Sequence, residues 1–302
     1  MHQALRAAPG SAPVISDASA TPHPLLLGLI GSPITGSAAR RMHEAAAAAA
    51  GLQAQYRLID VPRADRAKLG VLLEGVRLLG FTGVNVTYPY KEAVIPLLDS
   101  LSPTAAAIGA VNTILVHDGE LIGHNTDATG FARACQQVLG DLGDAPVVLI
   151  GAGGVGRAMA FALAELGLRE LRLVDIAPGK AAALAAALRG RIAARVCADV
   201  PEAVEEAGGV INATPVGMLP DRHNPVPPEL IHDRMWVADA VYTPLWTPLL
   251  QAARARGARV MTGRELCIHQ AAAAFRLFTG REPDIDTLAD AFDGVMAGRN
   301  ES

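Results

Sequence analysis

Residues 146–157 read Pro-Val-Val-Leu-Ile-Gly-Ala-Gly-Gly-Val-Gly-Arg, and this stretch decides the fold of the second half of the chain. Its apolar run, Val147–Ile150, is rich in β-branched residues and predicts a strand buried on both faces of a sheet. Gly151, Gly153 and Gly156 follow that strand with the spacing G-x-G-x-x-G. Strand and glycine turn together are the beginning of a dinucleotide-binding unit.

A helix and a second strand follow this turn, and an acid ends the second strand. Residues Arg157–Leu166 favour a helix that stops at Gly167, and the apolar strand Leu171–Val174 leads to Asp175. The first glycine allows the tight turn, the second lets the backbone approach a pyrophosphate, and the third lets the helix pack on the strand. The helix N-terminus adds N–H groups that attract the pyrophosphate. A turn with no ligand is the alternative explanation of the glycines, but the full order of elements favours dinucleotide binding.

Length and composition restrict the remaining possibilities. The chain has 302 residues, enough for two domains, and a formal net charge of −4, so no basic surface is expected to attract nucleic acid. No apolar run approaches the roughly 20 residues that span a membrane, and residues 1–24 have the composition of a disordered tail. Cys135, Cys197 and Cys267 do not fit the spacing of a metal site. We therefore expect a cytoplasmic protein without a metal, in which the cysteines are small buried residues.

The first half of the chain alternates predicted strands and helices. The strand Leu25–Ile30 is followed by the turn Gly31–Ser37 and by a helix over about Ala38–Ala50. Ser37 either caps that helix or holds a ligand carboxylate beside the free N–H groups of the first turn, and both roles are compatible. The next predicted elements are a strand over Gln55–Ile59 and a helix over Ala64–Leu79.

Two polar segments in this half are candidates for chemistry. In Gly83–Lys91 a strand ends in polar residues, and Pro89 is expected to open a helix with Lys91 in its first turn, where the helix dipole disfavours a cation. Asp127 either caps a predicted helix over Ala128–Leu139 or contributes to a site between a substrate lobe and a cofactor lobe. Between the two segments lie a predicted helix, Ser102–Gly109, and a hairpin, Val111–Val116 with Glu120–Gly123.

The second half predicts a doubly wound parallel sheet in which six strands alternate with helices. After Asp175 the predicted strands are Ala194–Cys197, Gly209–Asn212, Trp236–Ala240 and Ala258–Met261, and the predicted helices are Lys180–Leu188, one from Pro201, and Pro248–Arg256. Two more helices, Arg264–Phe278 and Ile285–Met296, are expected to return to the first domain. The predicted organisation is an α/β substrate-binding and catalytic domain, residues 25–126 with 264–302, and a Rossmann-type NAD-binding domain, residues 127–263.

Asp175 favours NAD over NADP as the cofactor. A carboxylate at the end of the second strand accepts hydrogen bonds from a ribose 2′-hydroxyl and repels a 2′-phosphate. Two unit charges about 4 Å apart at an effective dielectric near 20 interact by about 4 kcal/mol, so a preference of one or two orders of magnitude remains after solvent screening. Lys180 and Arg172 are the nearby cations that would instead support NADP.

The motifs of the chain, taken together, resemble those of the shikimate/quinate dehydrogenase family. The resemblance covers nearly all residues after 24, and the motifs follow the order of the family. They are Gly31-x-Pro33-Ile34-x-x-Ser37, Asn85-Val86-Thr87-x-Pro89-x-Lys91, Gly109-Ala110-Val111-Asn112-Thr113, Asn125-Thr126-Asp127, Gly151-Ala-Gly-Gly, Asn212-Ala213-Thr214-Pro215 and Gln270-Ala271-Ala272. The segments most like the NAD-dependent quinate/shikimate branch are Ile211–Met218, Asp239–Pro244 and Ile268–Pro283.

The resemblance implies a role for each matching residue. Lys91 and Asp127 correspond to the catalytic pair that exchanges a proton with the substrate hydroxyl being oxidised. The implied substrate-binding residues are Ser37, Asn85, Thr87, Asn112, Tyr242 and Gln270, and the implied cofactor-binding residues are Gly151, Ala152, Gly153, Gly154, Val155, Gly156, Asp175, Asn212, Thr214 and Gly263. Without the resemblance, Gln270 would be interpreted as a solvated helix residue and Tyr242 as a packing residue.

The chain also departs from the family pattern. The family has a second hydroxyl residue two positions after the serine, where this chain has Ala39, and the histidine common before the serine is Gly36. A lost hydrogen bond to a charged group costs roughly 1.5–3 kcal/mol. We therefore expect either that the substrate carboxylate is held differently, with Arg40 or Arg41 as candidates, or that the natural substrate is a variant ring acid.

These observations lead to one principal hypothesis and two alternatives. The chain is expected to be an NAD-dependent dehydrogenase that oxidises the C3 hydroxyl of shikimate, quinate or both, as a monomer or homodimer. One alternative is the NADP-linked biosynthetic reaction toward shikimate. The other is a non-catalytic protein that senses shikimate-like acids, against which the Lys91 and Asp127 pair argues.

Overall fold

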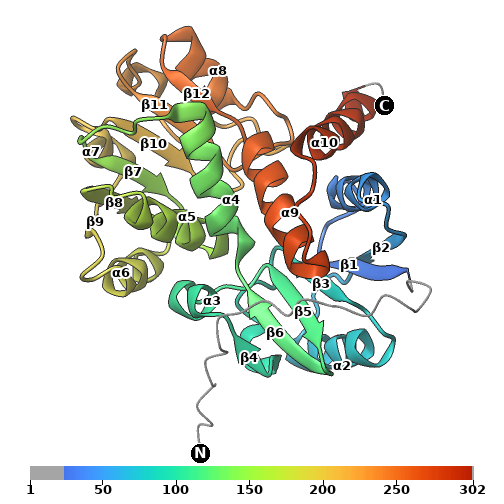
Figure 1. Cartoon of the computed structure of the whole chain (residues 1–302). Helices are drawn as coiled ribbons and strands as arrows, with labels where there is room; N and C mark the ends of the chain where they lie inside the picture. The colour runs from blue at the N-terminus through green and yellow to red at the C-terminus, as the bar shows by residue number, and fades with distance from the viewer. Residues whose placement is uncertain (1–23, 301–302) are drawn as a thin grey trace, which may run out of the picture. The chain divides into compact units, whose positions relative to one another are not determined.

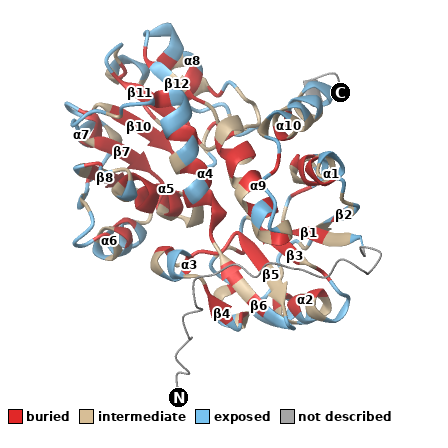
Figure 2. Ribbon diagram, in the orientation of Figure 1, coloured by how far each residue is buried: buried red, intermediate tan, exposed pale blue. Residues whose placement is uncertain are grey.

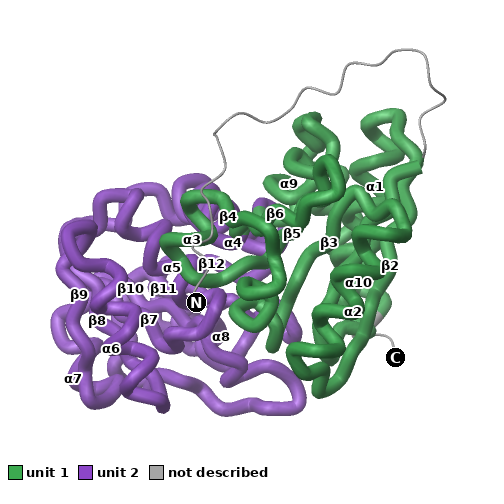
Figure 3. Tube along the Cα trace, turned by 90° about the horizontal axis from the view of Figure 1, so that it is seen from below, with its two compact units in different colours: residues 1–126, 270–302 green, residues 127–269 purple. Residues whose placement is uncertain are grey.

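The structure is a computed structural model that describes residues 24–300. The chain divides into two units (Figure 3): unit 1 contains the described residues up to Thr126 and those from Gln270 onward, and unit 2 contains Asp127–His269. The predicted tail, residues 1–24, lies outside the described residues except for Pro24. Each unit is built around one sheet, and the two are described separately.

Unit 1 contains a mixed six-stranded sheet with the order β2-β1-β3-β5-β6-β4. Its strands are β1 (Leu25–Gly31), β2 (Ala54–Asp60), β3 (Gly83–Val86), β4 (Ser100–Leu101), β5 (Thr113–His117) and β6 (Glu120–His124). β1 pairs in parallel with β2 and β3, whereas β5 runs antiparallel to β3 and β6. Asp118 and Gly119 both have positive φ, +49° and +79°, which is the backbone of the tight turn predicted for this hairpin.

Helices cover both faces of this sheet. They are α1 (Ala39–Ala49), α2 (Arg66–Leu78), α3 (Pro103–Ile108), α9 (Gly263–Thr279, which crosses the division between the units) and α10 (Ile285–Asn300), with the 3₁₀ turn η1 (Ile95–Leu97). Because side chains alternate along a strand, Ile30 packs on the α2 side, whereas Leu27 and Leu29 pack against Phe278 of α9. α10 packs against α1 (Figure 1), so the predicted return of the C-terminal helices is confirmed.

Unit 2 contains a fully parallel six-stranded sheet with the order β12-β11-β10-β7-β8-β9. The strands are β7 (Val147–Ile150), β8 (Glu170–Val174), β9 (Ala193–Val196), β10 (Gly209–Asn212), β11 (Trp236–Asp239) and β12 (Arg259–Met261). The helices are α4 (Thr126–Ala134), α5 (Gly154–Glu165), α6 (Pro178–Ala187), α7 (Val200–Val204) and α8 (Pro248–Ala255), with the π-helical turn η2 (Cys135–Leu139) and the 3₁₀ turn η3 (Pro228–Leu230). The predicted doubly wound sheet is confirmed.

The centre of this sheet is covered on both faces. Every residue of β7, β10 and β11 is buried, as Figure 2 shows. Val148 and Val210 pack with Leu249 and Leu250 of α8 on one face, and α5 and α6 pack against β7, β8 and β9. Continuous apolar runs are what such doubly covered strands require.

Three predicted helices differ clearly from the structure. The helix predicted over Ala128–Leu139 begins at Thr126, so Asp127 lies in its first turn instead of capping it, and after Ala134 it continues as the π-helical turn η2. Pro89 does not open a regular helix, because the chain forms turns up to η1, and the carbonyl of Lys91 accepts a hydrogen bond from the N–H of Val111 at 2.8 Å. The helix after the glycine turn begins at Gly154, three residues earlier than predicted, so part of the glycine motif is helical.

No helix within residues 24–300 is long and apolar enough to cross a membrane. All three cysteines lie in this described part, and none forms a disulfide.

Candidate functional site

The glycine turn of unit 2 has the close backbone contacts that the motif predicts. Gly151 has φ +100°, and a Cβ there would lie 2.8 Å from Cγ2 of Thr214. A Cβ on Gly156 would lie 2.0 Å from the carbonyl oxygen of Gly151, so only glycine lets α5 pack this closely. A Cβ on Gly153 would meet no atom within 4 Å, which leaves open space beside the backbone at the position where the motif expects a pyrophosphate. The turn therefore fits a dinucleotide.

Asp175 directly follows β8 and lies against this turn. Its Oδ2 accepts a hydrogen bond from the N–H of Ala152 at 2.7 Å, and its Oδ1 accepts one from the N–H of Ala177 at 2.7 Å. Each carboxylate oxygen keeps a second lone pair, so the group can still accept a hydrogen bond from a ribose hydroxyl. Gly154 and Val155 belong to the first turn of α5, where backbone N–H groups without helical partners are available to an anion, whereas the N–H of Ala152 is bonded to Asp175.

Of the two cations near the acid in sequence, Arg172 is held elsewhere. Its Nε lies 2.9 Å from Oε1 of Glu170, and its Nη1 donates to the carbonyl of Ala203 at 3.0 Å and to that of Glu205. Lys180 is exposed at the start of α6. Only Lys180 of these two therefore has an exposed position from which it could approach an added phosphate.

Asn212 and Thr214 are tied together at the carboxyl end of β10. The Oδ1 of Asn212 accepts hydrogen bonds from the hydroxyl of Thr214 at 2.6 Å and from its N–H at 3.1 Å. Since Thr214 also borders Gly151, the loop that carries these two residues forms one wall of the glycine turn. Asn212, Thr214 and the glycine motif, which were all predicted to bind the cofactor, therefore lie side by side in unit 2.

A buried carboxylate that the sequence did not single out holds Asn212 in place. The Oδ1 of Asp239 accepts from Nδ2 of Asn212 at 3.0 Å and from the N–H of Val241 at 2.9 Å, and its Oδ2 accepts from the hydroxyl of Thr247 at 2.7 Å. Burial raises the pKa of Asp239 from 3.8 to about 7, because the charged form loses its hydration, although these hydrogen bonds lower it.

Gly263 and Tyr242 lie near the carboxyl end of β11. A Cβ on Gly263 would lie 2.6 Å from the carbonyl oxygen of Val241, so glycine is required at this close approach. Tyr242 follows Val241 and is half-buried in unit 2. The other predicted substrate residues belong to unit 1, so the role of Tyr242 in substrate binding stays a prediction.

In unit 1, the turn after β1 contacts the segment after β3 at the carboxyl ends of these two neighbouring parallel strands. A Cβ on Gly31 would lie 2.3 Å from Cγ2 of Thr87, and the N–H of Ser32 donates to the carbonyl of Tyr88 at 3.0 Å. Ser37 stands at the end of this turn, and its Oγ accepts from the N–H of Ala39 at 3.2 Å. Ser37 is therefore not the N-cap of α1 that the sequence predicted: Ala38 occupies that position, and Ser37 bonds the N–H of Ala39 from the residue before it. A role of Ser37 toward a ligand stays a prediction.

Asn85, Asn112 and Gln270 belong to one hydrogen-bonded cluster in unit 1. The Nδ2 of Asn85 donates to Oγ1 of Thr113 at 3.0 Å, and Oγ1 of Thr113 donates to Oδ1 of Asn112 at 3.2 Å. The Nδ2 of Asn112 donates to Oγ1 of Thr126 at 2.9 Å and lies 3.5 Å from Oε1 of Gln270. Three residues that are far apart in the sequence therefore present their carboxamides together, as a site for ring hydroxyls requires.

Lys91 and Asp127 are each connected to this cluster through the backbone. The carbonyl of Lys91 is bonded to Val111, the neighbour of Asn112, and Asp127 directly follows Thr126. Lys91 is half-buried in unit 1, whereas Asp127 is buried in the first turn of α4 and is the first residue of unit 2. Their action as a pair stays a prediction.

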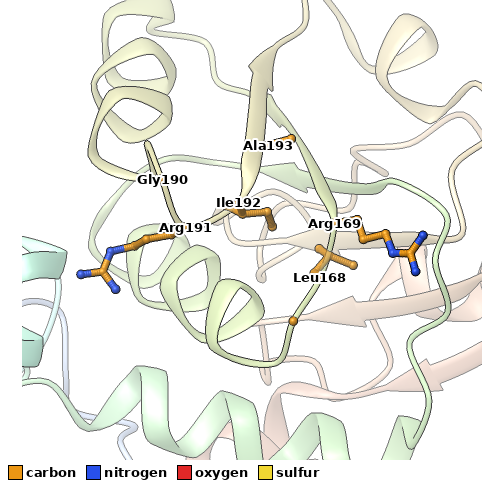
Figure 4. Close-up of a pocket in the computed structure, with 7 residues that line it drawn as sticks. Leu168, Arg169, Gly190, Arg191, Ile192 and Ala193 are labelled. Atoms are coloured by element: carbon orange, nitrogen blue, oxygen red, sulfur yellow. The ribbon is translucent and has the colours of Figure 1, made fainter.

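A surface depression of about 540 Å³ in unit 2 lies at the amino ends of β8 and β9, whereas the glycine turn is at the carboxyl end of β7. Figure 4 shows that the side chains of Arg169 and Arg191 point away from each other there. Arg169 pairs with Asp144 at 3.0 Å, and Arg191 lies over the ring of Phe161. Nothing in this depression repeats the chemistry of the predicted site.

Several residues of the site have no signal in the local sequence. Thr113 and Thr126 lie within family motifs, but nothing in the motif sequence predicts that their hydroxyls link the carboxamides of the cluster. Tyr56 and Asp239 each bond a predicted site residue that lies more than 25 positions away along the chain. Only an alignment of relatives or a structure would find such long-range partners.

The strand order, the glycine turn and the acid after β8 define a dinucleotide-binding α/β protein, and the amide cluster gives it a second polar site. Residues 29–114 match the family model of the shikimate dehydrogenase substrate binding domain, and residues 268–291 match that of the shikimate 5′-dehydrogenase C-terminal domain.

Relatives agree with these matches over most of the chain. The quinate/shikimate dehydrogenase (NAD(+)) of Corynebacterium efficiens is 45% identical over 276 residues, which cover 89% of this chain and 97% of that protein. The shikimate dehydrogenase (NADP(+)) of Streptomyces avermitilis is 46% identical over 273 residues, which cover 88% and 94%. The structure of quinate dehydrogenase from Corynebacterium glutamicum in complex with NAD superposes with a TM-score of 0.83 at 40% identity, covering 90% of this chain and 99% of that one. The chain belongs to the shikimate dehydrogenase family, and it is an oxidoreductase.

Proposed function

We propose that the protein catalyses the reversible, NAD-dependent oxidation of shikimate or quinate at the C3 hydroxyl, which becomes the 3-dehydro ketone. The observation that carries the proposal is the amide cluster of Asn85, Asn112 and Gln270, together with the glycine turn and Asp175. Carboxamides both donate and accept, so a cluster of them suits a ring that carries several hydroxyls.

The preference for NAD rests on Asp175. Its carboxylate lies against the glycine turn, where it would accept from a ribose hydroxyl and repel a 2′-phosphate. Arg172 is held by Glu170 and by two carbonyls, which weakens the argument for NADP. Relatives carry either NAD(+) or NADP(+) in their names, so kinetics must distinguish the two cofactors.

The chemistry divides between the cofactor and the chain. NAD, when bound, supplies the hydride acceptor. Lys91 takes the proton from the hydroxyl being oxidised, and Asp127 stabilises the ammonium that results. Ser37, Thr87 and Tyr242 hold the carboxylate end of the acid, with Arg40 or Arg41 as candidates for the part that a second hydroxyl residue plays elsewhere in the family. Gly263 offers a backbone contact to the nicotinamide amide.

A kinetic grid of shikimate and quinate against NAD and NADP tests this function. We expect NADH formation with at least one acid and a kcat/KM for NAD about 10- to 100-fold above that for NADP. No reduced cofactor from either acid would refute the proposal. A higher kcat/KM with NADP would instead favour the biosynthetic NADP-linked reaction, and binding of an acid without turnover would favour a sensor.

Lys91→Ala tests the catalytic assignment. Turnover should be lost, whereas the affinity for NAD, measured by fluorescence titration, should change little because the glycine turn is untouched. Lys68→Ala is the matched control, since Lys68 is an exposed lysine of α2 in the same unit. Full activity in the Lys91 variant would show that another group moves the proton.

A further inference from the structure

The side chain of Tyr56 bonds to the amide cluster through Asn85. It lies on β2 with 2% of its surface exposed, and its hydroxyl donates a hydrogen bond to Oδ1 of Asn85 at 2.8 Å. A bond between a phenol and a buried carboxamide is more than packing, because it determines which end of the amide faces which neighbour.

The contacts of Asn85 allow one orientation of its carboxamide. With Oδ1 facing Tyr56, Nδ2 donates to Oγ1 of Thr113 at 3.0 Å and lies 3.4 Å from the carbonyl oxygen of Asn112. The reverse orientation would place Oδ1 of Asn85 beside that carbonyl oxygen, with no proton between two acceptors. Tyr56 on one side and the Asn112 carbonyl on the other therefore fix the amide.

That orientation is consistent with the direction of the bonds that follow. Because Thr113 receives a proton from Asn85, its own hydroxyl is free to donate to Oδ1 of Asn112 at 3.2 Å. Oδ1 of Asn112 also accepts from the N–H of Thr126 at 2.7 Å, which leaves its Nδ2 to face Oε1 of Gln270. Three groups thus determine which donors and acceptors the cluster can offer a ligand: the hydroxyl of Tyr56 and the carbonyl of Asn112, which orient Asn85, and the N–H of Thr126, which orients Asn112. Tyr56 is the one side chain among them.

The ring of Tyr56 is itself held by a buried histidine. His43 of α1 stacks on it with ring centroids 5.0 Å apart and an angle of 10° between the planes. Burial lowers the pKa of His43 to about 4, so the stacked imidazole is neutral near pH 7. Phe275 and Phe278 of α9 lie on the same imidazole, at 6.5 and 5.8 Å. Aromatic packing on this side leaves the phenol little freedom to turn away.

We propose that Tyr56 is a positioning residue for substrate recognition, which acts through Asn85 to set the hydrogen-bonding pattern that the amide cluster presents to a polyhydroxylated ring acid. This inference rests on the proposed function, because it assigns the cluster to the substrate. Tyr56 needs no contact with the ligand for this role.

Tyr56→Phe in the full-length enzyme tests the role, because it keeps the aromatic ring and the stack on His43 but removes the hydroxyl. We expect KM for the ring acid to rise roughly tenfold, which is the loss of one buried hydrogen bond, while KM for NAD stays within twofold of the wild type. Tyr90→Phe is the matched control: Tyr90 is also buried, and its hydroxyl accepts from the N–H of Ala64 at 2.8 Å and donates to the carbonyl of Val61. That variant should lower the Tm and leave KM for the acid unchanged.

A double variant tests whether Tyr56 acts through Asn85. If it does, Tyr56→Phe combined with Asn85→Ala should raise KM for the acid no further than Asn85→Ala alone. Additive effects, or an unchanged KM in Tyr56→Phe, would overturn the proposal while the activity of the wild type still supported the proposed function. If the wild type neither oxidises nor binds shikimate or quinate in calorimetry, both proposals fail. If it binds without turnover, the same comparisons made on Kd decide the role of Tyr56.

Discussion

Replacing Asp239 with asparagine should change how the stability of the protein depends on pH. Burial raises the pKa of this carboxyl from 3.8 to about 7, and the side chain is only 2% exposed, so solvent screens it little. A group whose pKa is higher in the folded state contributes stability below its unfolded pKa and loses that contribution as the pH rises through the folded value. From these two pKa values, the contribution of Asp239 to the free energy of unfolding falls by about 3 kcal/mol between pH 5 and pH 8.

Urea unfolding of the wild type and of Asp239→Asn at pH 5, 6, 7 and 8 measures this contribution. The free energy of unfolding of the variant minus that of the wild type should increase by about 3 kcal/mol across the series, because asparagine does not titrate. Groups that titrate in both proteins, such as His43, cancel in this difference. A difference that stays constant with pH would refute the raised pKa, and a difference that decreases would reverse the assigned sign.

Three further predictions concern the glycine turn, the buried histidine and the cofactor. Gly156→Ala should weaken NAD binding and lower the Tm in scanning calorimetry, because its Cβ would lie 2.0 Å from the carbonyl oxygen of Gly151. Gly179→Ala in α6 is the control: its Cβ would meet nothing within 4 Å, so it should raise the Tm slightly. Because the pKa of His43 is lowered in the folded state, the free energy of unfolding of the wild type should fall by about 3 kcal/mol between pH 6.5 and pH 4 through this group. His43→Phe should not show this fall, and an equal fall in wild type and variant in urea titrations would contradict the prediction. Asp175→Ala should lower the ratio of kcat/KM for NAD to that for NADP about 10- to 100-fold, and a ratio equal to that of the wild type would exclude Asp175 as its cause.

Local patterns predicted most of the elements, because their causes are local. The run Val147–Ile150 is apolar at every position, as a strand covered on both faces must be, and the positive φ of Asp118 and Gly119 follows from residue types that tolerate it. The turn after Pro89 is different, since the carbonyl of Lys91 bonds to Val111 on another segment. A contact of that kind overrides local helix propensity and leaves no trace in the neighbouring residues.

The same reasoning explains which site residues were missed. Tyr56 bonds a partner 29 positions away, and Asp239 bonds one 27 positions away. Asn85 and Asn212 were predicted because they belong to short motifs, whereas the residues that orient them belong to none. Residues expected to touch a ligand can therefore be recognised from sequence motifs more readily than the residues that hold them in place.

Asp175 limits how the cofactor preference of this protein could be redesigned. Its two oxygens accept hydrogen bonds from the N–H of Ala152 in the glycine turn and from the N–H of Ala177 before α6, so the carboxylate links the loop after β7 to the loop after β8. Asparagine has one acceptor oxygen and would turn its amide protons toward the other N–H, and alanine would satisfy neither. No single neutral replacement serves both loops. If the kinetic grid shows the proposed preference for NAD, acceptance of a phosphorylated ribose would therefore require rebuilding the segment between β8 and α6 as a unit, rather than exchanging one side chain.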